Sequence, residues 1–212
     1  MANVRETFLT FPLYLISHPF KGFDEMKFSG KGSMLYALVA FAALGLVSLI
    51  SGAFTGFVVI GFWSPTPSFS AHIVLLYTYS PIALFCIANW SVTTITNGKG
   101  SLREIFLVYS YAIYPQIFLN VLGVLLSNVV TLGEVGFANG MFAAGVFFVN
   151  MYMFIGLIVI HEYTLLKAIL TAVLTVLSMA VITFVFALFF SLFNNVTSFF
   201  FTIIDELGQL LF

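Results

Sequence analysis

Five long stretches of this sequence consist almost entirely of apolar residues, and each is long enough to cross a membrane as a helix, which takes about 20 apolar residues. They cover residues 34–62, 72–95, 105–126, 138–160 and 165–193. Only helices and closed barrels satisfy their backbone polar groups inside hydrocarbon, and these runs lack the alternation of barrel strands. We therefore expect an all-α fold, a polytopic integral membrane protein with a five-transmembrane-helix bundle.

The composition supports a membrane protein over every soluble class. Of the 212 residues, 61% are hydrophobic and 7% are charged, whereas about 25% of the residues of a soluble domain are charged. Seven basic and eight acidic residues give a formal net charge of −1, so there is no basic field that would attract a nucleic acid. We expect the lipid bilayer, and no nucleic acid, as a partner.

The basic residues between the apolar stretches orient the predicted helices. With five spans, all of them fall on one side of the membrane: Arg5, Lys21, Lys27, Lys31, Lys99, Arg103 and Lys167. Loops rich in lysine and arginine remain in the cytoplasm. The sequence therefore predicts a cytoplasmic N-terminus and an external C-terminus.

The residues before the first span form a separate predicted unit, 1–32, ahead of a transmembrane domain at 33–212. Residues 4–16 are apolar at their end but too short to span, which favours an interfacial helix. Residues 17–27 mix aromatic side chains with both signs of charge. Their exposed face is either simply solvated or a docking surface for a cytoplasmic partner or lipid head groups.

The C-terminal tail, residues 194–212, is also amphipathic. It either continues the fifth span as one long helix or lies on the outer surface of the membrane. We favour the long helix, with Asp205 and Glu206 solvated beyond the membrane.

Four neutral amides fall within the predicted spans, namely Asn89, Gln116, Asn120 and Asn150. An amide in hydrocarbon needs a hydrogen-bonding partner, so we expect all four to face the bundle. They would either link helices, with bonds of about 0.6 kcal/mol on average, or line a polar groove. No charged residue lies at membrane depth, which argues against a proton-coupled transporter.

Two further patterns concern helix geometry and packing. Pro81 and Pro115 each predict a kink in their helix. Small residues recur every four positions in spans one and four, which allows close packing within the chain or a homo-oligomer. These residues are Ser48, Gly52, Gly56, Gly136, Gly140 and Ala144.

The sequence offers no arrangement typical of catalysis or metal binding. His161 and Glu162 are adjacent, and adjacent helical side chains point too far apart to chelate one ion well. Motifs for zinc, for phosphate loops and for dinucleotides are missing from the sequence. The single cysteine, Cys86, lies in an apolar run that favours an inert thiol. We expect no enzyme activity, no catalytic residue, no cofactor and no metal site.

Several short motifs, in order along the chain, resemble those of the Yip (Ypt-interacting protein) domain family and of its bacterial members in particular. They are HPFKGFDEMK at 18–27, NWSVTT at 89–94, NGKGSLREI at 97–105, YSYAIYP at 109–115, Ser127-Asn128 with Thr131 and Glu134, and Gly156-Leu157 followed by His161 and Tyr163.

The resemblance implies a five-helix membrane domain with a cytoplasmic N-terminus. Eukaryotic relatives are associated with Rab-type GTPases, but the longer soluble N-terminal region and Asp-Leu-Tyr-Gly-Pro element of those proteins are missing here. Bacterial relatives are often encoded near ABC-transporter components. The compact form therefore points to a bacterial plasma membrane.

Two functions follow as hypotheses. The first is a non-enzymatic scaffold or accessory partner of another membrane complex, such as an ABC-type transporter. Its docking surface would comprise His18, Lys21, Asp24, Lys27, Asn97, Lys99, Arg103 and Glu104. The second is a protein that handles lipids or passes small solutes through a polar groove made by the four amides.

Overall fold

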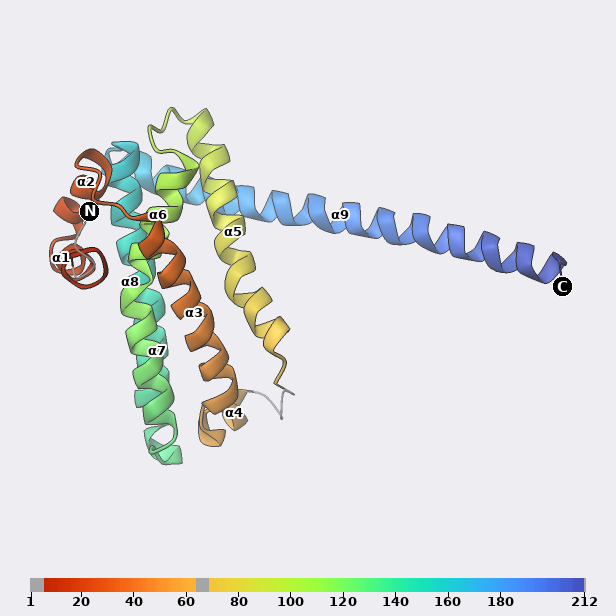
Figure 1. Ribbon diagram of the computed structural model, residues 1–212, viewed down its shortest axis with the longest axis horizontal. Helices are drawn as coiled ribbons and strands as arrows, with labels where there is room; N and C mark the ends of the chain where they lie inside the picture. The colour runs from red at the N-terminus through yellow and green to blue at the C-terminus, as the bar shows by residue number, and fades with distance from the viewer. Residues whose placement is uncertain (1–5, 64–68, 212) are drawn as a thin grey trace.

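The computed structural model describes residues 6–63 and 69–211, and within this part the chain is helical with no strand. Figure 1 shows long helices lying side by side and a last helix that leaves them. The helices that are long and apolar enough to span a membrane are α3 (Met34–Phe54), α5 (Ala71–Ile95), α6 (Leu102–Ala112) continued by α7 (Tyr114–Ser127), α8 (Val135–His161) and α9 (Leu165–Leu211). The all-α membrane fold is confirmed.

The first spanning helix is shorter than the sequence predicts. It ends at Phe54 instead of continuing to position 62, and a short helix, α4 (Phe57–Trp63), follows it. Thr55 is extended, and the Gly56 N–H donates to Ser127 Oγ at 2.8 Å. A Cβ on Gly56 would collide with the Ser127 carbonyl. The helix therefore ends where the backbone packs against the end of α7.

The N-terminal segment is part of the core in its described residues. After one π-helical turn (Glu6–Thr10), α1 (Phe11–Ser17) and α2 (Pro19–Phe28) form a hairpin. Phe11 lies edge-on against Tyr111 of α6 with ring centroids 5.4 Å apart, and the Tyr152 hydroxyl of α8 donates to the Ile16 carbonyl at 2.9 Å. The predicted interfacial segment thus packs against the bundle and shares its hydrophobic core.

The two prolines behave differently. Pro115 lies at the start of α7, where the third span breaks after Ala112, because proline supplies no N–H to continue the ladder. Pro81 lies inside α5, which continues without interruption. A 3₁₀ turn, η2 (Leu132–Glu134), joins α7 to α8 at the far end of the bundle.

Helix α9 is one continuous helix of 47 residues, so the tail extends the fifth span, as expected. In Figure 1 it runs across the direction of the other long helices and away from them. Its first turns contact α5 and α8, and Ala168, Thr171 and Thr175 are buried in this part of the helix. Beyond Thr175, no α9 side chain that the structure describes is buried.

Candidate functional site

Charged residues of the predicted docking surface gather at one end of the bundle. We call this end, which contains Lys27, Lys99, Arg103 and Glu162, the basic end. Lys27 of α2 and Lys99 of the α5–α6 loop both donate to the carboxylate of Glu162, Lys27 at 3.0 Å. Lys27 also donates to the Ile160 carbonyl at 2.7 Å, at the C-terminus of α8. Glu162 reaches both lysines because it adopts the left-handed conformation (φ 55°) that ends α8. These ion pairs hold the pKa of Glu162 below its ordinary value of 4.5, mainly through the bond from Lys99.

A buried histidine fastens the α5–α6 loop to the same helix end. His161 is 2% exposed, and its Nδ1 accepts a hydrogen bond of 3.1 Å from the Gly100 N–H. Its ring stacks on Tyr163, whose hydroxyl lies 2.8 Å from Thr96 Oγ1. The loop approaches so closely that a Cβ on Gly100 would lie 2.7 Å from His161 Cε1. The loop is therefore built around this imidazole.

The start of α6 determines where Arg103 lies. Ser101 and Glu104 form a capping box, in which the Glu104 carboxylate accepts from the Ser101 N–H at 2.7 Å. Asn97 begins the loop with a positive φ of 53°. The Glu104 carboxylate is thus already bonded within the helix cap. The Arg103 side chain is exposed and has no carboxylate partner in the part of the chain that the structure describes.

The remaining docking candidates lie on the first two helices. His18 stacks on Tyr14, and its Nδ1 lies 2.9 Å from Ser17 Oγ. Lys21 and Asp24 are exposed on α2, opposite its buried residues Gly22, Phe23 and Met26. The structure therefore joins Lys27 and Lys99 through Glu162, and it leaves Lys21 and Asp24 on a separate outward face.

The structure does not bring the four amides of the predicted groove to one place, and only Gln116 and Asn120 lie against the same residue, Gly145. Asn89 is buried, and its Nδ2 donates to Thr175 Oγ1 of α9 at 3.1 Å. Asn150 is exposed and donates at 2.7 Å to the Val146 carbonyl of its own helix. Asn120 and Gln116 face Gly145 of α8. Asn150 therefore does not face the bundle as expected, and Asn89 serves to hold α9.

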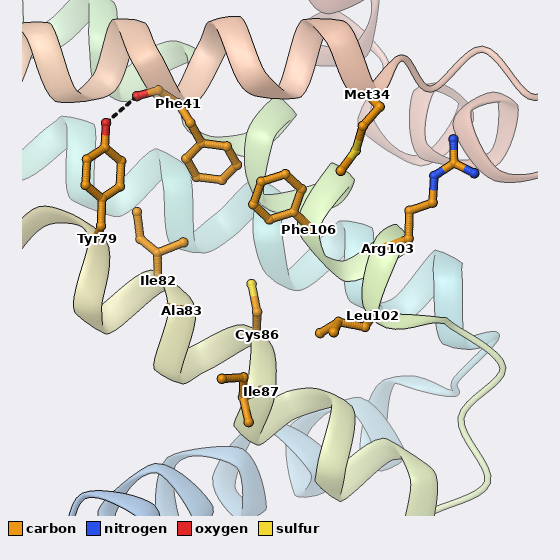
Figure 2. Close-up of a pocket in the computed structure, with 10 residues that line it drawn as sticks. All are labelled: Met34, Phe41, Tyr79, Ile82, Ala83, Cys86, Ile87, Leu102, Arg103 and Phe106. Carbon is orange, nitrogen blue, oxygen red and sulfur yellow. Dashed lines mark hydrogen bonds between the residues drawn. The ribbon is translucent and has the colours of Figure 1, made fainter.

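A different cavity, an apolar groove of about 590 Å³, lies between α3, α5 and α6. Figure 2 shows Cys86 pointing into it, Tyr79 at one end and Arg103 at the other. The Tyr79 hydroxyl donates to the Phe41 carbonyl at 2.8 Å and ties α5 to α3. The residues that line this groove are Met34, Phe41, Tyr79, Ile82, Ala83, Cys86, Ile87, Leu102, Arg103 and Phe106.

Sequence reasoning missed two parts of this arrangement. It considered His161 and Glu162 as a metal motif and rejected that motif, and it did not predict that both residues organise the basic end. The described residues contain no group of three His, Cys, Asp or Glu side chains that could hold a metal ion. The feature of the sequence that indicates the His161 contact is the pair Gly98 and Gly100, because glycines have no side chain and leave room for the imidazole. The apolar groove had no signal, because its lining residues are ordinary for a membrane helix.

Comparisons with models of protein families, with curated proteins and with solved structures found no match.

Proposed function

We propose that this multi-pass membrane protein is a non-enzymatic accessory partner of another membrane protein, and that α9 provides the main contact surface. The observation that carries the proposal is the length of α9. Its apolar part runs from Leu165 to Ile204, 40 residues, or about 60 Å at 1.5 Å per residue. That is about twice the 30 Å hydrocarbon core, and bilayers adjust to a mismatch of only a few ångströms at modest cost. The bilayer alone therefore does not match the apolar length of α9, and a second membrane protein would cover the rest.

The outer half of α9 also carries a polar stripe on a largely apolar helix. Ser191, Asn195, Ser198 and Thr202 follow at intervals of four, three and four residues, which places them on one face. The Asn195 amide has no hydrogen-bonding partner in the described residues. Polar side chains within membranes typically bond across to a neighbouring helix. The stripe therefore fits the transmembrane helices of a second protein.

A second contact surface lies on α2. Phe20, Lys21, Asp24 and Phe28 are all exposed on this helix, and Phe20 and Phe28 are 57% and 60% exposed. This face combines aromatic anchors with both signs of charge. We propose that it lies in the cytoplasm of a bacterial cell, because the basic residues gather at this end. An ABC-type transporter is the partner class that the resemblance to the Yip family implies.

Site-specific photo-crosslinking in the native membrane tests the proposal. A photoreactive amino acid replaces Phe189 on α9 or, as a matched control, the equally exposed Phe147 on α8. The expected result is one multi-pass membrane protein attached at position 189 and absent at position 147, and Asn195→Leu should weaken this adduct. Adducts only with lipid, or only with a second copy of this chain, would overturn the proposal.

A further inference from the structure

We propose that the apolar groove between α3, α5 and α6 binds one acyl chain of a phospholipid, and that Arg103 binds the phosphate of the same lipid. This site is separate from the α9 contact surface and does not depend on it.

The groove has the chemistry of an acyl-chain site. Nine of its ten lining residues carry no charge, and the exception, Arg103, lies at one end. Tyr79 and Ile87 are eight residues apart along α5, so the groove follows this helix for about 12 Å before it reaches Leu102. Its volume of about 590 Å³ is within the range of small-molecule sites. An extended hydrocarbon chain fits an apolar groove that runs along a helix.

Arg103 connects this groove to a second, polar hollow. The hollow measures about 280 Å³, and Lys27, Ser101, Arg103 and Glu104 are among its lining residues. In Figure 2 the Arg103 side chain extends away from Cys86, so its stem borders the apolar groove and its guanidinium lies beyond it. An apolar chain site and a polar hollow that share one arginine match an amphipathic ligand.

The charges favour a phosphate as the polar part. Glu162 already accepts from Lys27 and Lys99, and Glu104 accepts from the Ser101 backbone. Arg103 lacks a carboxylate partner in the described residues. Its planar fork of N–H donors suits two phosphate oxygens. A phospholipid therefore satisfies both the guanidinium and the groove, whereas free phosphate would leave the groove unfilled.

The test uses the full chain in dodecyl maltoside, a detergent without phosphate. The probe is a phosphatidylglycerol with a diazirine in one acyl chain, and its attachment points are mapped by peptide mass spectrometry. We expect attachment to α5 and α6 around Cys86. Unlabelled phosphatidylglycerol should compete about tenfold better than diacylglycerol with the same chains, as expected from the loss of one charge-assisted bond. Inorganic phosphate should not displace the probe from the groove.

Two matched pairs of variants separate binding from folding. Arg103→Gln should weaken probe binding about tenfold, whereas Lys21→Gln removes the same charge from α2 and should not. Ala83→Phe fills the groove and should abolish attachment there. Ala143→Phe adds the same ring to the exposed face of α8 and should leave attachment in the groove unchanged. Equal competition by diacylglycerol, or an Arg103→Gln variant that binds like the parent, would overturn the role of Arg103. Attachment outside the groove alone would overturn the site.

Discussion

The Lys27 ammonium lies 3.0 Å from the Glu162 carboxylate, although 135 residues separate the two in the sequence. This bond connects the N-terminal hairpin to the end of α8. Because Lys99 donates to the same carboxylate, Glu162 holds three segments of the basic end together.

Replacing Glu162 by glutamine should loosen this end of the molecule. Lys27 is 10% exposed and would keep only the Ile160 carbonyl as an acceptor, which leaves a largely buried ammonium without an opposite charge. We expect a lower midpoint of thermal unfolding in detergent and faster proteolysis within the 97–101 loop. Asp24→Asn, which removes an exposed carboxylate from α2, is the matched control and should change neither. An unchanged Glu162→Gln protein would show that Lys27 finds another acceptor.

The contribution of Glu162 to the stability of the fold should disappear in acid. The two lysines hold its folded-state pKa below the ordinary value of 4.5, so the ion pairs stabilise the fold above that pH and are lost as the pH falls through the folded pKa. The difference in unfolding midpoint between the parent and Glu162→Gln should therefore be full at pH 7 and shrink below about pH 4.5. Glu25, whose pKa is also lowered by Lys31, is present in both proteins and cancels. A difference that does not shrink at any acidic pH would contradict the ion-pair explanation.

The spans were predictable because they depend on local composition, and the features that were not predictable depend on distant contacts. The break before Tyr114 lies where Pro115 favours one, although Pro81 leaves α5 continuous. In contrast, α3 ends at Phe54 because Gly56 bonds to Ser127, 71 residues away. A hydropathy pattern carries no information about such a partner.

The candidate site shows the same division. The clustering of Lys27, Lys99 and Arg103 at one end follows from counting spans, and the structure confirms that they lie together. The pairing of Asn89 with Thr175 does not follow, since it requires the path of α9 across α5. Periodicity identifies polar residues within a helix, but the neighbouring helix decides what each of them contacts.

Gly156 should tolerate no side chain, because α2, α6 and α8 meet at this position. A Cβ there would collide with Val108 and lie 3.0 Å from the Phe23 ring. We expect Gly156→Ala to lower the free energy of unfolding by about 1–3 kcal/mol, the usual cost of overpacking. Gly140 is the control, because it lies on the same helix and a Cβ there would meet nothing within 4 Å. Gly140→Ala should be neutral or stabilising, since alanine favours a helix. Denaturant unfolding in micelles measures the free energy of unfolding of both variants. Equal changes in Gly156→Ala and Gly140→Ala would contradict the close packing at Gly156.

The hydrogen bond from Asn89 to Thr175 should be measurable in a double-mutant cycle. Each of Asn89→Leu and Thr175→Val removes one partner, and the double variant removes both. We expect a coupling energy of about 0.6 kcal/mol, the average for such bonds in membranes, with the double variant less destabilised than the sum of the singles. A coupling of zero would mean that α9 is held to α5 by apolar packing alone.

Thiol labelling in whole cells should establish the orientation. In a Cys86→Ser background, Lys21→Cys lies at the basic end, whereas Val129→Cys lies 81% exposed beyond α7 at the opposite end. Because basic loops remain in the cytoplasm, a membrane-impermeant maleimide should label Val129→Cys in intact cells and Lys21→Cys only after permeabilisation. Glu206→Cys, near the end of α9, should be labelled in intact cells if this helix crosses the membrane. Labelling of Lys21→Cys without permeabilisation would reverse the orientation and place the α2 face outside the cell.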